Sequence, residues 1–118
     1  MALGGGLAGC GGDDGPSDEK QQADDAEAKA TARNAQVALE TYFTGKQTYE
    51  GATAEALAQI EPTLSGADLT VITGSQNYEV TAESRDGHDF TVTRDPGGIV
   101  TRRCEPEGEG GCSDTGEW

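Results

Sequence analysis

The chain has 118 residues, 22 acids against 8 lysines and arginines, and a formal net charge of −14. This length allows one small domain, and the shortage of Lys and Arg excludes a basic patch for nucleic acid. No apolar run approaches the roughly 18 residues of a membrane-spanning helix. The acids concentrate in residues 13–27 and 104–118, whereas residues 28–103 are nearly balanced in charge. We therefore expect the folded part to centre on this middle segment.

The start of the chain holds a candidate processing site. Residues 7–10 read Leu7-Ala8-Gly9-Cys10 and precede a stretch rich in Gly and Asp. A branched aliphatic residue, two small residues and a cysteine resemble the lipobox of bacterial lipoproteins. The resemblance implies that Cys10 receives a diacylglyceryl thioether and becomes the new N-terminus. The protein is then expected to be exported and anchored to the outer face of the cell membrane or envelope.

This reading divides the N-terminal region into two parts. Residues 1–10 are a signal peptide with its lipobox, truncated because no basic residue and no full apolar core precede the box. We therefore expect the true start to lie upstream of Met1. Residues 11–23 are the predicted flexible acidic tether, and residues 24–118 are the predicted domain.

A long helix is predicted over residues 18–44. The segment lacks Gly and Pro and is rich in Ala, Glu, Gln and Lys, which are strong helix formers. Its apolar residues recur at helical spacing and form one stripe, made of Ala28, Ala32, Ala35, Leu39 and Phe43. We expect its Ala-rich first half to project beyond the domain, with Asp24 and Asp25 on a solvated face. Gly45 is the predicted stop signal.

A second helix and four strands are predicted next. Thr53 is the expected N-cap of a helix over 53–60, which Pro62 ends. Alternating apolar and polar residues then predict strands with one buried face, over residues 69–73, 78–84, 89–94 and 99–103. Asp86-Gly87 predicts a two-residue hairpin turn, and Gly-rich segments make the other two turns. The fold class is α+β, with a long N-terminal helix packed on a four-stranded antiparallel meander.

Two further cysteines flank a short loop near the C-terminus. Cys104 and Cys112 enclose only acids, glycines and one proline, which cannot form a core. A disulfide closing this loop would contribute about 2.5 kcal/mol in the chain-entropy model, which matters for so lean a domain. Zinc competes for the two thiolates, but His88 as the single histidine makes a poor ligand set. One lipid-bearing cysteine with one disulfide fits an exported protein.

The region 24–118 carries a second resemblance. Its helix Ala26–Phe43, its strand segments Tyr78–Ala82 and Phe90–Arg94, and its cysteine loop 104–112 resemble the globular part of a type IV pilin or pseudopilin. The resemblance implies a pilin-like domain that acts in assembly or surface interaction with envelope partners. The pilin cleavage site and apolar helix are absent and an Asp-rich segment replaces them, so the chain does not polymerise as a major pilin does.

Enzymatic chemistry is not indicated. No nucleophile lies beside a usable base, and we expect His88 to be a solvent-exposed turn residue. The five acids of residues 104–118 leave calcium as an alternative cofactor, although their spacing matches no calcium-binding loop. We expect Trp118 to fold back over the sheet edge or the core, with an exposed anchor for a partner as the alternative.

Two functions stay open on these grounds. The first is a non-enzymatic, lipid-anchored envelope protein whose pilin-like domain serves assembly or surface interaction. The alternative is an envelope lipoprotein with a cystatin-like helix-on-sheet domain that binds a small ligand or inhibits an enzyme. A pilin-type domain should lack a large pocket, whereas a ligand-binding domain should enclose one between the helix and the sheet.

Overall fold

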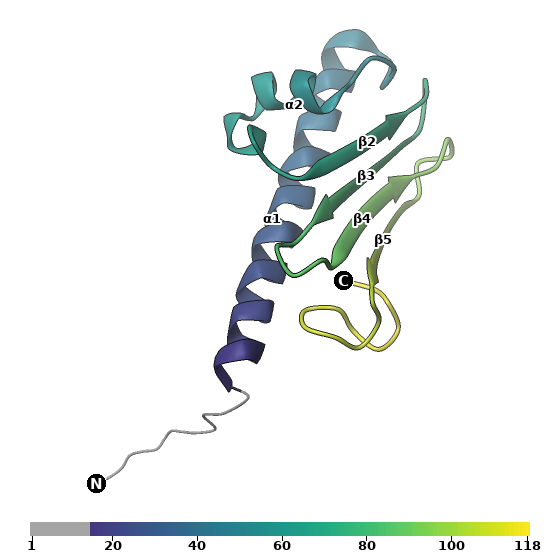
Figure 1. Ribbon diagram of the computed structural model, residues 1–118. Coiled ribbons are helices and arrows are strands. Elements are labelled where there is room, and N and C mark those ends of the chain that lie inside the picture. The colour runs from purple at the N-terminus through teal and green to yellow at the C-terminus, as the bar shows by residue number, and fades with distance from the viewer. Residues whose placement is uncertain (1–14) are drawn as a thin grey trace, which may run out of the picture.

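A long helix, α1 (Gly15–Lys46), packs across one face of a four-stranded sheet (Figure 1). The computed structural model describes residues 15–118, so the predicted lipobox and Cys10 lie outside the described residues. Residues 15–23 belong to α1, although the predicted tether 11–23 covered all of them and the predicted helix began only at residue 18. The prediction was wrong there because this segment is rich in helix formers, and Pro16 is tolerated in the first turn of a helix.

The C-terminal end of α1 also lies beyond its predicted position. Gly45 lies within the last turn, and the helix continues to Lys46. Gln47 then adopts a left-handed conformation with φ of 61°, and its N–H donates to the carbonyl of Phe43 at 2.7 Å. This bond satisfies a terminal carbonyl of the helix, so Gln47 is the residue that ends it.

The connection between helix and sheet contains two short helices. In α2 (Ala54–Ile60), the side chain of Thr53 accepts a hydrogen bond from the Ala56 amide, which confirms Thr53 as the N-cap. A 3₁₀ turn, η2 (Pro62–Leu64), follows. Both pack against α1, and α2 also reaches the first strand.

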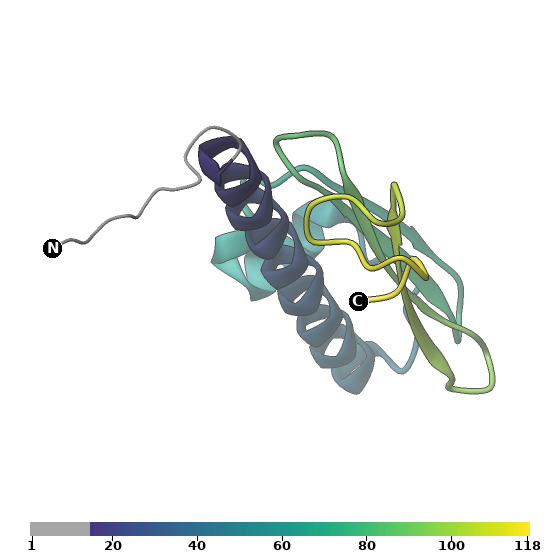
Figure 2. The same ribbon diagram turned by 90° about the horizontal axis from the view of Figure 1, so that it is seen from below.

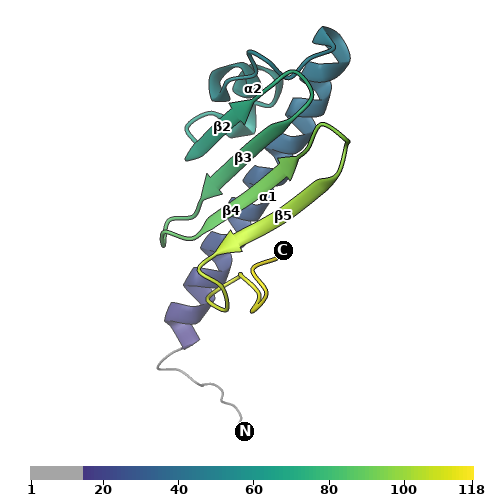
Figure 3. The ribbon, with the colours of Figure 1, turned by 90° about the vertical axis from the view of Figure 1, so that its right-hand side faces the viewer.

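The sheet is an antiparallel meander, which confirms the predicted fold class. Its strands are β2 (Leu69–Thr73), β3 (Tyr78–Glu83), β4 (Asp89–Arg94) and β5 (Val100–Glu105), in the order β2-β3-β4-β5. Figure 3 shows these four strands side by side with α1 behind them. The first three match the predicted segments within one residue, and β5 lies one to two residues later.

The core forms where the Ala-rich face of α1 meets the central strands. Small side chains on α1 let the helix approach β3 and β4 closely, and both layers are buried at the contact. The buried set includes Ala28, Ala32, Ala35 and Leu39 from α1, and Tyr78, Val80, Ala82, Phe90 and Val92 from the sheet. Figure 2 shows that the C-terminal segment lies beside α1, on the face of the sheet that the helix covers.

The C-terminal segment is closed by a disulfide. Cys104 and Cys112 are bonded, with their Cα atoms 5.7 Å apart, which confirms the predicted pairing and excludes zinc ligation by these two sulfurs. Within the described residues, no helix is both long and apolar enough to cross a membrane.

Candidate functional site

The hairpin between β3 and β4 is closed by a turn over Ser84–His88. A β-turn spans Ser84–Gly87, with the Gly87 N–H donating to the Ser84 carbonyl at 3.0 Å and Gly87 at a φ of 88°. The Ser84 Oγ accepts a further bond from the His88 amide at 3.0 Å. The predicted two-residue turn at Asp86-Gly87 was therefore wrong. The loop is longer because Ser84 caps it and Gly87 takes the left-handed position at its end.

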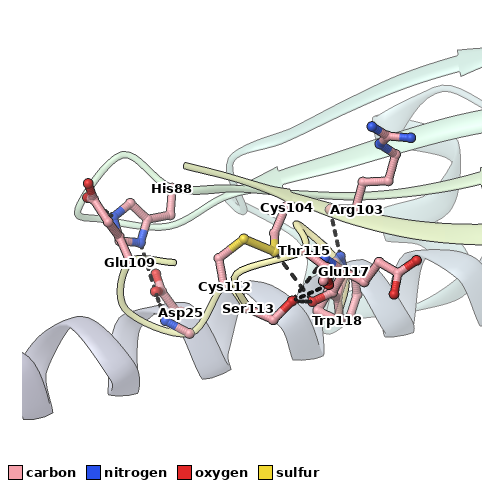
Figure 4. The surroundings of a disulfide bond; sticks show 11 residues. Asp25, His88, Arg103, Cys104, Glu109, Cys112, Ser113, Thr115, Glu117 and Trp118 are labelled. Carbon is pink, nitrogen blue, oxygen red and sulfur yellow. Dashed lines mark hydrogen bonds and ion pairs between the residues drawn. A yellow bond between two sulfur atoms is a disulfide. The ribbon is translucent and has the colours of Figure 1, made fainter. Parts of the chain in front are cut away.

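His88 is buried rather than exposed. Its exposed fraction is 5%, and its Nδ1 lies 2.8 Å from Oδ2 of Asp25, which is fully buried on α1. Figure 4 shows the imidazole directly above this carboxylate. The predictions of a solvated His88 and a solvated Asp25 were both wrong, because the hairpin folds onto the first half of α1. The two residues are 63 positions apart, and no local pattern connects them.

The disulfide-closed loop covers this pair from a third side. The Gly111 N–H donates to Asp25 Oδ2 at 2.6 Å, and Glu109 Oε1 lies 3.8 Å from His88 Nε2. A Cβ atom at Gly110 would clash with Asp25 Oδ2, and one at Gly111 would lie 2.8 Å from the Asp25 Cβ. The two glycines are therefore what allows the loop backbone to approach the carboxylate.

Asp86 completes the group. Its Oδ1 accepts a bond from the Ser84 hydroxyl, and its Oδ2 lies 3.5 Å from His88 Nδ1. Two carboxylate oxygens, Asp25 Oδ1 and Asp86 Oδ2, are buried without a hydrogen-bond partner. Asp25, Asp86 and His88 each offer one ligand atom, and these three atoms lie within 4.8 Å of one another. We refer to these residues as the Asp25–Asp86–His88 cluster.

The electrostatics of the cluster favour a charged imidazole. Burial lowers the pKa of His88, but the hydrogen bond and charge of Asp25, with the charges of Asp86 and Glu109, outweigh burial and raise it. Burial raises the pKa of Asp86, but the hydrogen bond from Ser84 and the charge of His88 outweigh burial and lower that pKa. The imidazolium and the carboxylates thus stabilise one another in a poorly hydrated site.

The other predicted site residues lie apart from the cluster. Trp118 folds back as predicted: its Nε1 donates to the Arg103 carbonyl at 2.7 Å, and its ring meets Phe90 edge-on. Arg33 and Arg102 also approach the indole. Across residues 15–118, the five acids of the loop 104–118 do not gather into a group of potential metal ligands.

A polar cleft opens beside the cluster. It has a volume of about 320 Å³ and lies between α1 and the segments that lead into β2 and out of β3. Its charged lining residues are Asp24, Glu27, Asp68, Glu83 and Arg85. Because most of these are acids, a ligand that enters it would have to carry positive charge.

Comparison with known proteins identifies no relative: no protein-family model, curated protein or solved structure matches this chain. The site is therefore interpreted from its own geometry.

Proposed function

We propose that this chain is a non-enzymatic, exported protein that a lipid on Cys10 holds to the cell envelope, and that its pilin-like domain binds partner proteins there. The observation that carries the proposal is the placement of the chain's two functional ends. The helix that follows the candidate anchor starts at one end of the domain, and the exposed apolar residues of the sheet lie at the other (Figure 1).

The anchor-facing end is defined by α1. The helix begins at Gly15, five positions after Cys10 in the sequence, so a lipid on Cys10 would place this end near the membrane. The Asp25–Asp86–His88 cluster holds α1 to the sheet close to its start. The cluster therefore fixes the first half of α1 relative to the sheet.

The opposite end exposes apolar side chains. Ile72 near the end of β2 is 58% exposed, and Ile99 and Val100 at the start of β5 are 66% and 42% exposed. Ile72 lies on the opposite edge strand and points to the other face of the sheet from Val100. We therefore call only Ile99 and Val100 the distal apolar group. Aliphatic side chains exposed together at one end of a small domain are a common basis for protein interfaces, and an anchored domain would present them away from the membrane.

The anchor is tested by mass. Protein isolated from the membranes of the cells that produce it should carry a diacyl adduct on Cys10, and Cys10→Ser should move the protein to the soluble fraction. An unmodified Cys10 in membrane-derived protein would refute the anchor.

The partner surface is tested by cross-linking in intact cells. Ile99→Lys should remove cross-linked adducts that Val37→Lys retains, because Val37 is equally exposed, at 62%, but lies on α1 and not on the sheet. Equal adducts from both variants would refute the assignment of this surface.

The ligand-binding alternative receives support from one feature, the acidic cleft beside the cluster. Its volume of about 320 Å³ is at the lower end of the range for small-molecule sites, but such sites are mostly apolar. A polyamine such as spermidine is a suitable probe. Saturable binding that Glu83→Gln weakens would favour the alternative, and failure to bind would leave the partner-binding proposal as the better one.

A further inference from the structure

The Asp25–Asp86–His88 cluster also has the ligand types of a metal site. We propose that it binds one divalent transition-metal ion of the zinc class, through Asp25 Oδ1, Asp86 Oδ2 and His88 Nδ1. The ion would join α1 to the β3–β4 hairpin directly.

The cluster contains a pair of unsatisfied carboxylate oxygens. Asp25 Oδ1 and Asp86 Oδ2 are both buried, and neither accepts a hydrogen bond. Buried carboxylate oxygens without partners are costly, at about 1–3 kcal/mol each or more for charged groups. Asp25 is fully buried, so water cannot readily provide the missing donor. A cation between the two oxygens would satisfy both.

The spacing of the three ligand atoms is close to that of a metal site. One atom from each residue lies within 4.8 Å of the others, and His88 Nδ1 is 3.5 Å from Asp86 Oδ2. In a tetrahedral zinc site with bonds of about 2.0–2.2 Å, neighbouring ligand atoms are about 3.4 Å apart. The distances to the Asp25 ligand atom, which are at most 4.8 Å, would have to adjust to this length when the ion binds.

A second atom of each ligand already contacts a neighbouring polar group. Asp25 Oδ2 accepts from the Gly111 N–H, and Asp86 Oδ1 accepts from the Ser84 hydroxyl. His88 Nε2 faces Glu109 Oε1 at 3.8 Å. A carboxylate, hydroxyl or amide behind each ligand fixes ligand orientation in metal sites, and a carboxylate behind a metal-bound histidine is a common arrangement.

The donor set selects the class of metal. One imidazole nitrogen and two carboxylate oxygens suit Zn²⁺ and its first-row neighbours. Calcium prefers six to eight oxygen ligands, which these three side chains do not supply. Three protein ligands leave the fourth position of a tetrahedral zinc site for a water molecule that would enter with the ion.

Metal binding has to replace an existing hydrogen bond. Without metal, the proton on His88 Nδ1 points to Asp25 Oδ2 at 2.8 Å. An ion bound to Nδ1 has to displace that proton and takes over the attraction of both carboxylates, so binding should weaken in acid.

The test uses the full chain, free of affinity tags, with its disulfide intact and with Cys10→Ser so that no free thiol competes. Zn²⁺ titrated by calorimetry should saturate at one ion per chain. His88 is the single histidine of the sequence, so its imidazole proton NMR signals need no assignment and should shift over the same titration. Zn²⁺ should also raise Tm, whereas Ca²⁺ at the same concentration should not.

Matched variants decide whether the ion sits in the cluster. Asp86→Asn preserves side-chain shape and should weaken Zn²⁺ binding at least tenfold, while Asp24→Asn, one residue from Asp25 on α1, should leave it unchanged. A Glu109→Gln variant should weaken binding less than Asp86→Asn. Circular dichroism would establish that each variant is folded.

Three results would overturn the proposal. One is the absence of saturable Zn²⁺ binding to the folded parent chain. Another is equal binding by the Asp86→Asn and parent chains. The last is several weak equivalents of Zn²⁺ that Ca²⁺ displaces, since this would place the ions on the acidic surface.

Discussion

The β3–β4 and β4–β5 hairpins have closely similar turns but very different surroundings. In Ser84–His88 the end residues are joined by an N–H to carbonyl bond of 2.8 Å, and in Asp95–Ile99 by one of 3.0 Å. Each loop contains a left-handed glycine, Gly87 at a φ of 88° and Gly98 at 96°. A side-chain oxygen of the first residue also accepts from the last amide in both. Local residues therefore specify the same turn twice.

What differs is the residue that ends each loop and what covers it. His88 is 5% exposed beneath the disulfide-closed loop and beside α1, whereas Ile99 is 66% exposed at the distal end. The first hairpin lies at the end of the sheet where Asp25 and the C-terminal loop converge, and the second lies at the opposite end. Turn chemistry therefore fixes the path of a hairpin, whereas the neighbouring elements determine the contacts of its side chains.

The largest expected effect comes from removing the carboxylate that holds the first hairpin. Asp25→Ala leaves the His88 imidazolium and the Gly111 N–H without their partner, and we expect a loss of about 3–5 kcal/mol in the free energy of unfolding. Asp95→Ala in the second hairpin removes one exposed bond to the Ile99 amide and should cost about 1 kcal/mol. Urea unfolding measures both, and similar losses would contradict the comparison.

The disulfide should act on the first hairpin alone. Replacing Cys104 and Cys112 with Ser should cost about 2.5 kcal/mol, the chain-entropy value for a nine-residue loop. Amide hydrogen exchange should increase at His88, which the loop covers, more than at Ile99. Equal increases at the two amides would show that the loop does not stabilise the first hairpin specifically.

The contact between the loop and Asp25 depends on a glycine. Gly110→Ala introduces a Cβ against Asp25 Oδ2 and His88, at a left-handed φ of 54°, and we expect a cost of about 2 kcal/mol. Gly97→Ala is the matched control, because its Cβ would come no nearer than 3.4 Å to Asp95 Oδ1. We expect its Tm to change little, and a comparable fall in both variants would contradict the close approach of the loop.

The smallest effect is on pH dependence in metal-free protein. The pKa of His88 is raised in the folded state by Asp25, Asp86 and Glu109, above the value of about 6.5 for a free histidine. The stabilisation is therefore complete below about pH 6.5 and is lost as pH rises through the folded pKa. With EDTA present and Cys10→Ser, Tm should fall as pH rises above about 6.5. A His88→Gln variant should show a flatter profile, and parallel profiles would refute the linkage.

Much of the fold followed from short-range patterns. Alternation placed β2 and β4 at their observed bounds, Thr53 was recognisable as an N-cap, and the spacing of Cys104 and Cys112 predicted their bond. These features depend on residues a few positions apart. The end of α1 was less predictable, because a left-handed Gln47 competes with Gly45 as the terminator.

The cluster was not predictable in the same way. A lone histidine beside Asp-Gly has the composition of an exposed turn, and an aspartate early in a helix has the composition of a solvated face. Their burial depends on a contact between positions 25 and 88 and on a loop backbone that reaches Asp25 through Gly111. The sequence signal for this contact is the Gly110-Gly111 pair before Cys112, since adjacent glycines allow a close backbone approach.

The length, the net charge of −14 and the cysteine spacing predicted, from sequence alone, a small acidic domain with one disulfide. Hydrophobic periodicity determined its helix-on-meander fold. Only the tertiary structure decided that two of the acids and the single histidine lie together, with Asp25 and His88 buried. Periodicity reports the neighbours of a residue along one element, whereas the ionic environment of Asp25 is set by two segments that reach it from 61 or more positions away.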